Sequence, residues 1–195
     1  WAARIRRVLL LGPSHRVGFR GIATPGCDRF ETPLGEIAID LPAIAAISPL
    51  ESVVEMTTAH ACEHSLEVQL PFLQTLLGDF TLVPLVVGEV DPSAVAAVLE
   101  TLWGGPETLI VISSDLSHYH PYREARALDL NTSRAIEQLD SHLAGEQACG
   151  CHPLNGLLEA AKAHQLHLTT LDVRNSGDTA GGKQQVVGYG AYCLH

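Results

Sequence analysis

The chain has 195 residues, of which 46% are hydrophobic and 17% charged, a composition that excludes disordered and low-complexity architectures. Its 12 basic and 22 acidic side chains give a formal net charge of −10, which disfavours nucleic acid and anionic membranes as partners. No apolar run reaches the roughly 18 residues of a membrane span or has the pattern of a secretory signal. We therefore expect a globular, cytoplasmic chain that forms a single domain over residues 1–195.

The first half of the chain alternates between apolar runs and turn residues. An apolar run predicts a buried strand at 5–11, and residues 16–62 are rich in Gly, Pro and Thr with no clear period apart from a short helix near 42–47. Leucines at helical spacing predict a helix from Glu63 to Leu77 with a kink at Pro71. A strand follows at 80–87, and the proline within it, Pro84, indicates an edge or bulged position.

The second half continues the alternation. The expected elements are helix 92–103, strand 108–112, helix 123–139, a helix that ends near 164, and strands 167–173 and 186–193 joined by a glycine-rich connection. Strands that alternate with helices predict an α/β sheet covered on both faces. Ligands of such sheets gather at the carboxyl ends of the strands, which makes polar residues at those positions candidate site residues.

Two histidines of the first half are candidate site residues. His15 follows the first strand, whose end is a rigid mount for a metal ligand, although a histidine that caps a turn is the alternative. His64 and Glu67 share one face of the predicted helix, where a histidine beside a carboxylate can act as a ligand or base. The alternative is that Glu63 and Glu67 only complement the positive end of the helix dipole.

A second group of candidates follows the strand at 108–112. Asp115 and His118 are three residues apart, so the carboxylate could orient the imidazole as a general base. Ser114 or Asp115 as an ordinary helix N-cap is the competing interpretation.

The five cysteines are an odd number in a chain of this size, which favours reduced thiols over a disulfide framework. Cys149, Cys151 and His152 stand just before a predicted helix, where the helix dipole would lower the pKa of a thiol and favour the thiolate that a metal needs. The C-x-C spacing lacks the paired C-x₂₋₄-C pattern of a structural zinc site. Burial as ordinary apolar side chains is the alternative for these cysteines.

Five segments in order carry a resemblance to a known family: GPSHRVGFRGIATPGCDRFETPLGEIAID, EHSLEVQLPFLQ, ISSDLSHYHPYREA, CGCHPLNGLL and NSGDTAGGKQQVVGYGA. Together they resemble the Memo family, also called AmmeMemoRadiSam system protein B in bacteria and archaea. That family is similar in fold to the class III extradiol dioxygenases of the LigB type. The resemblance therefore implies a mixed central α/β sheet flanked by helices, with a metal pocket at the strand ends.

Matched by motif, the resemblance implies that His15 and Cys149 are metal ligands for a copper or iron ion. His118 corresponds to the acid or base of the related dioxygenases, with Asp115 as its companion, and His64 to a further pocket residue. We accordingly predict that His15, His64, His118 and Cys149 converge on one pocket. The family's PHAG motif, whose histidine is the remaining ligand, does not occur, and we expect the chain to start after it. Cys151 would be a partial substitute ligand.

Three functions are consistent with these patterns. The leading one is a metal-dependent redox protein acting on an unknown small molecule. A ring-opening dioxygenase is the second, although a thiolate in place of a carboxylate ligand shifts the preference toward softer metals such as Cu(I). The third is a noncatalytic interaction protein that has a protein partner or forms a homo-oligomer. The metal content of the purified protein would separate the noncatalytic function from the two metal-dependent ones. Oxygen uptake with catechols would separate the ring-opening dioxygenase from the redox protein.

Overall fold

The computed structural model describes residues 2–179 and 181–195, which divide into two compact units. Unit 1 ends at Ser113 and unit 2 begins at Ser114, and each is described below by itself. That the two form a single domain stays a prediction. Over the described residues, none of the helices combines the length and apolar character needed to cross a membrane.

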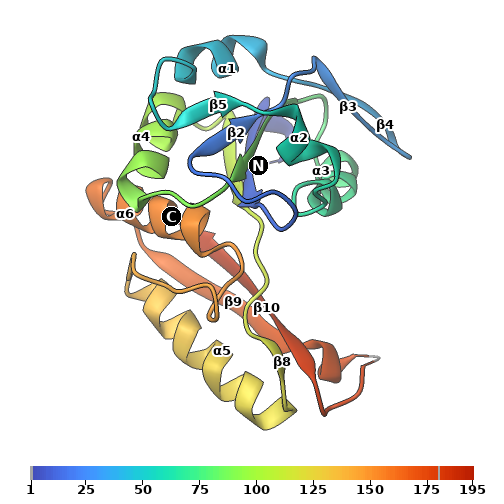
Figure 1. The fold of residues 1–195 in the computed structure, drawn as a ribbon, viewed down its shortest axis with the longest axis vertical. Coiled ribbons are helices and arrows are strands. Elements are labelled where there is room, and N and C mark those ends of the chain that lie inside the picture. The colour runs from blue at the N-terminus through green and yellow to red at the C-terminus, as the bar shows by residue number, and fades with distance from the viewer. Residues whose placement is uncertain (1, 180) are drawn as a thin grey trace. The chain divides into compact units, whose positions relative to one another are not determined.

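Unit 1 contains a five-stranded mixed sheet (Figure 1). Its strand order is β5 (Val53–Glu55), β2 (Ile22–Thr24), β6 (Thr81–Val87), β1 (Arg7–Pro13) and β7 (Thr108–Ile112). β1 pairs in parallel with both β6 and β7, whereas β2 runs antiparallel to β6 and parallel to β5. The carboxyl ends of β1 and β7 therefore lie at the same edge of this sheet.

Burial on both faces explains why the central strands read as continuous apolar runs. Val8 and Leu10 of β1 belong to a buried cluster shared with α2 (Thr57–Ala61) and α3 (Leu70–Leu76). Leu9 and Leu11 point to the opposite face because side chains alternate along a strand, and both are fully buried. α4 (Pro92–Leu102) lies on the other side of this sheet from α2 and α3 (Figure 1), and α1 (Leu41–Ile47) packs against α4.

Residues 16–62 contain far more regular structure than the sequence indicates. Besides β2, β5, α1 and α2, they form a hairpin of β3 (Arg29–Thr32) and β4 (Gly35–Ala38). These strands have three or four residues, too few for a period of two to stand out. The predicted helix from Glu63 is also shorter than expected, with a single 3₁₀ turn at Glu67–Gln69 followed by α3.

The prediction of an edge or bulged position at Pro84 holds only locally, because β6 as a whole lies between β2 and β1. β2 pairs with β6 only at Val86 and Val87, so it does not extend to Pro84. Since Thr81 donates its N–H to Arg6 on the β1 side, alternation directs the nitrogen of Pro84 to the other side. The missing N–H therefore costs no ladder hydrogen bond to β2.

Unit 2 is built on a three-stranded antiparallel sheet in the order β8 (His118–His120), β10 (Val186–Leu194) and β9 (Leu168–Asn175). α5 (Tyr122–Glu137) packs along β9 and β10 (Figure 1). α6 (Cys151–Ala163) precedes β9, and the 3₁₀ turn η3 (Ser176–Asp178) begins the glycine-rich connection to β10. The expected strands at 167–173 and 186–193 are confirmed, whereas β8 was not predicted because it has three residues.

Candidate functional site

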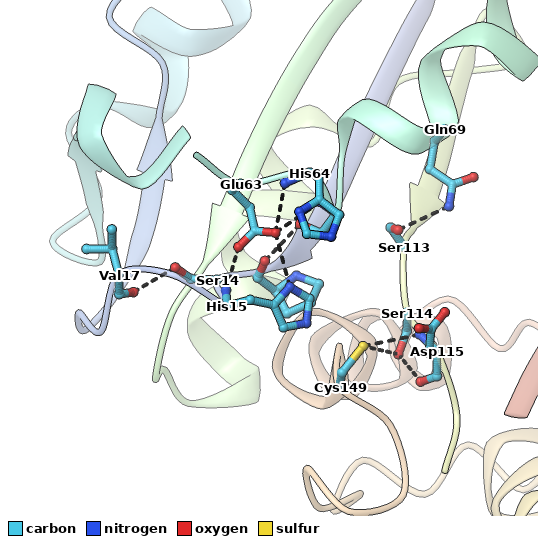
Figure 2. A network of polar contacts seen from close by, with 12 residues as sticks. Ser14, His15, Val17, Glu63, His64, Gln69, Ser113, Ser114, Asp115 and Cys149 are labelled. Carbon is cyan, nitrogen blue, oxygen red and sulfur yellow. Dashed lines mark hydrogen bonds and ion pairs between the residues drawn. The ribbon is translucent and has the colours of Figure 1, made fainter. Parts of the chain in front are cut away.

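A buried carboxylate organises the polar groups of unit 1 that follow β1. The side chain of Glu63 is 1% exposed and accepts hydrogen bonds from the backbone N–H groups of His15, His64 (3.0 Å) and Ser65 (3.0 Å). Its Oε1 also lies 3.1 Å from Nδ1 of His15 (Figure 2). Glu63 thus ties the turn after β1 to the segment before α3.

These contacts set both the charge of Glu63 and the tautomer of His15. Burial by itself would raise the pKa of Glu63, but the hydrogen bonds from the N–H and ring of His15 and from Ser65 lower it to about 2. The carboxylate therefore accepts a hydrogen bond from the Nδ1–H group of His15, a tautomer in which Nε2 has the free lone pair. A carboxylate in this position is the usual partner of a metal-binding histidine.

The structure corrects the interpretation of Glu63 as a residue that complements a helix dipole, because no helix begins there. The ring of His64 stacks on the ring of His15; the two ring centroids are 6.3 Å apart and the ring planes are inclined by 27°. The relation between Glu63 and His15 was missed because the two residues are 48 positions apart. The only signal in the sequence was that GPSH follows a predicted strand and that EHS begins a predicted helix.

In unit 2, three side chains that the sequence singled out lie together. One ligand atom from each of Asp115, His118 and Cys149 falls within 4.8 Å of the others. Nε2 of His118 is 3.6 Å from Oδ2 of Asp115, which is ion-pair distance when the ring is protonated. All three residues are partly exposed, so a small ligand can reach them. It is the single group of this kind among the residues that the structure describes.

Backbone pairing holds Cys149 against the segment that carries Asp115. The N–H of Asp115 donates to Sγ of Cys149 (3.2 Å), and the N–H of Cys149 donates to the carbonyl of Asp115 (3.3 Å). Oγ of Ser114 accepts the N–H of Gly150 (2.9 Å) and donates to the carbonyl of Asp115 (2.7 Å) (Figure 2). The expectation that Ser114 or Asp115 caps its own helix is wrong, because β8 follows; Ser114 instead holds Gly150, the N-cap residue of α6.

The predicted lowering of the Cys149 pKa by the start of the following helix is also wrong. Burial raises the pKa of this thiol, and the charge of Asp115 raises it further, whereas hydrogen bonds from Asp115 and Ser114 lower it only in part. Cys149 is therefore a thiol at neutral pH. Burial likewise raises the pKa of Cys151, which lies in the first turn of α6 and is outside the group of three ligand atoms.

The chemistry of these three donors fits a transition-metal ion. A thiolate is a soft ligand that Cu(I) and iron accept, imidazole suits copper and iron, and a carboxylate oxygen suits Fe(II). The N–H of Asp115 would stabilise the negative charge that Cys149 gains when a metal displaces its proton. The predicted convergence of His15 and His64 of unit 1 with His118 and Cys149 of unit 2 stays a prediction.

Fold and site together define an α/β protein that has a mixed central sheet and a thiol, imidazole and carboxylate suited to a metal. A family model described as Memo-like protein matches residues 2–193. The chain belongs to the Memo-like protein family.

Similar proteins support this assignment. A MEMO1 family protein of Aeropyrum pernix is 38% identical over 94% of this chain and 70% of its own length. A MEMO1 family protein of Aquifex aeolicus is 37% identical over 94% of the chain and 73% of its own length. A crystal structure of an uncharacterized protein from Escherichia coli K12 is similar in fold, with a TM-score of 0.57 at 16% identity over 97% of this chain and 87% of that one.

Proposed function

We propose that this Memo-family chain is a metal-dependent redox protein that binds copper or iron through Cys149. The observation that carries the proposal is the clustering of the Asp115, His118 and Cys149 ligand atoms within 4.8 Å. A bound copper or iron ion would supply reversible one-electron transfer to a small-molecule substrate. The same set of donors can hold the ion in either oxidation state because it includes both soft and hard ligands.

The roles of the protein residues follow from their contacts. Cys149 is the anchor, since its sulfur already receives the N–H of Asp115. When the imidazole of His118 is not bound to the ion, Asp115 lies at ion-pair distance from it and can stabilise a proton that His118 takes from or returns to a substrate. In unit 1, Glu63 holds Nδ1 of His15, which supports the assignment of His15 as a metal ligand through Nε2.

Metal titration of four proteins tests the proposal. Cu(I) and Fe(II) affinities are measured by competition with a chromophoric chelator for the wild type, Cys149→Ser, Cys151→Ser and Cys193→Ser. We expect Cys149→Ser to weaken binding by at least about tenfold, since it removes the thiolate. Cys193→Ser is the matched control, because that cysteine is exposed and outside the ligand group. Equal affinity in all four proteins would show that Cys149 is a structural thiol.

The redox role needs a separate measurement. Oxygen consumption by the copper-loaded protein in the presence of ascorbate should exceed that of copper-loaded Cys149→Ser at equal metal content. His15→Ala tests the assignment in unit 1, and Arg16→Ala, an exposed neighbour, is its control. A wild type that binds metal but consumes no more oxygen than Cys149→Ser would refute the redox role and leave only metal binding. Oxygen uptake that requires a catechol would instead support ring-opening chemistry.

A further inference from the structure

Unit 2 contains a polar cavity of about 270 Å³ that lies between α5, β9 and η3. α5 contributes Tyr122, Arg126 and Asp129, which share one helix face because they are spaced four and three residues apart. β9 contributes Asn175 among other residues, and η3 contributes Asp178. None of the three proposed metal-site residues of unit 2 lines this cavity.

Asp129 is a buried carboxylate with one unused oxygen. The residue is 1% exposed, and its Oδ1 accepts the N–H of Ser117 at 2.9 Å. Its Oδ2 receives no hydrogen bond from any described residue and rests against Gly188, whose missing side chain leaves room for it. Among the described residues, only Ser117 Oγ and Thr170 Oγ1 are fully enclosed without a partner, so Oδ2 of Asp129 is not fully enclosed, and its residue lines the cavity.

Asn175 presents the complementary case of an unused donor. It is 2% exposed, and its Oδ1 accepts the N–H of Gly177 at 3.0 Å, which identifies the other amide atom as Nδ2. The two N–H groups of Nδ2 have no acceptor among the described residues, and this atom too escapes full enclosure. A buried amide with both donors unused is costly unless a ligand or water accepts them.

The other acidic groups of the cavity already have partners. Asp178 accepts hydrogen bonds from the hydroxyl of Tyr122 (2.6 Å) and the N–H of Asn175 (2.9 Å). Asp172 forms an ion pair with Arg174. Arg126 is exposed at the rim, where its charge acts on Asp178 and Tyr122. The unmatched groups are thus one carboxylate oxygen and one amide nitrogen, both of buried residues, in a cavity that the exposed Arg126 also lines.

We propose that this cavity binds a primary ammonium group with a neighbouring carbonyl or carboxylate oxygen, as found in a free α-amino acid or at a peptide N-terminus. The ammonium group donates to Oδ2 of Asp129, and the oxygen accepts from Nδ2 of Asn175. Arg126 adds attraction when that oxygen belongs to a carboxylate. A purely anionic ligand is disfavoured, since the lining carries three aspartates against two arginines.

Titration with four small probes tests the proposal. Amide resonances of the metal-free protein are followed by NMR during addition of alanine, alaninamide, alanyl-alanine or N-acetylalanine. Removal of metal excludes chelation by the amino group. We expect saturable shifts around Asp129, Asn175 and Gly188 with the first three probes and none with N-acetylalanine, which lacks the ammonium group. Tighter binding of alanine than of alaninamide would indicate a free amino acid, and tighter binding of alanyl-alanine would indicate a peptide N-terminus.

Three variants complete the test. Asp129→Asn keeps an oxygen for the N–H of Ser117 but removes the charge, and it should weaken binding of alanine by at least about tenfold. Arg126→Gln changes an exposed residue and should weaken alanine more than alaninamide. Asp140→Asn, an exposed carboxylate hydrogen-bonded to His142, is the matched control and should change nothing.

Three results would overturn the proposal: no saturable shift with any probe, equal shifts with N-acetylalanine, or undiminished binding by folded Asp129→Asn. If Asp129→Asn does not fold, Arg126→Gln and the comparison of alanine with N-acetylalanine decide the question. Because the titrations use metal-free protein, their outcome is independent of the proposed metal site.

Discussion

Replacement of Glu63 by glutamine is expected to destabilise unit 1 by about 3 kcal/mol at neutral pH. The folded protein lowers the pKa of this carboxyl from its ordinary 4.5 to about 2. Each pKa unit corresponds to about 1.4 kcal/mol, and the side chain is only 1% exposed, so solvent screening reduces the effect little. A glutamine side chain also has one oxygen in place of the two with which Glu63 accepts hydrogen bonds. Its NH₂ group would face an N–H donor, so that hydrogen bond would be lost.

The pH dependence of the stability difference between the wild type and Glu63→Gln identifies the cause of that difference. Because the folded pKa lies below the unfolded one, the stabilisation by ionised Glu63 is fully present above about pH 4.5. It is lost as the pH falls through 4.5 toward 2, where the carboxyl of the folded protein also takes up a proton. The wild type should therefore exceed Glu63→Gln in stability most clearly at pH 6 to 7, the difference should fall to roughly half or less at pH 3, and the two should converge only at about pH 2 and below.

Urea unfolding followed by tryptophan fluorescence measures this difference, because Trp103 belongs to unit 1 and the sequence of unit 2 contains no tryptophan. Glu67→Gln is the matched control: it changes an exposed glutamate four residues away and should alter stability by less than about 0.5 kcal/mol. A stability difference for Glu63→Gln below about 1 kcal/mol, or one that stays constant from pH 7 to pH 3, would refute the reasoning.

Three further predictions concern other parts of the chain. Asp40→Ala should cost about 1–2 kcal/mol in urea unfolding, because the carboxylate accepts the N–H of Ala43 at the start of α1 and pairs with Arg7 at 2.8 Å. Gly188→Ala should cost about 1–3 kcal/mol, since its Cβ would overlap the carboxylate of Asp129, whereas Gly145→Ala, which meets no neighbouring atom, should leave the melting temperature unchanged. Cu(I) affinity should rise with pH through neutrality, since burial raises the pKa of the anchoring thiol and metal binding must release its proton; a pH-independent affinity would contradict this.

The parts of the fold that the sequence predicts are those with long, one-sided or continuous apolar patterns. The runs that form β1 and β6 are apolar because both of their faces are buried, and β7 is an apolar run of half-buried residues. α4 has an apolar stripe between a proline at its start and glycines after its end. β2 and β5 have three residues each, and their partners lie far away in the chain. Such strands are formed by tertiary pairing and leave no local period.

Only the part of the candidate site that depends on local sequence could be predicted. His118 and Asp115 are three residues apart, so their proximity follows from local sequence. Their approach to Cys149 depends on the pairing of Asp115 with a residue 34 positions later, and the chain's motifs indicated it only through resemblance to a family. The pKa of Cys149 could not be predicted, because burial of the sulfur outweighs the effect expected from the start of α6.

Glu63 and Asp129 are buried carboxylates with different capacities for binding. Glu63 accepts three backbone N–H groups and approaches the ring of His15, so both of its oxygens are occupied by the protein. Asp129 lines a cavity and accepts the N–H of Ser117 through one oxygen, and the other oxygen has no hydrogen-bond partner among the described residues. A saturated carboxylate positions its neighbours but gains little from a ligand, whereas one with a free oxygen gains a partner for a partly uncompensated charge. Glu63 is therefore expected to act by orienting His15, and Asp129 to act by contact with a ligand.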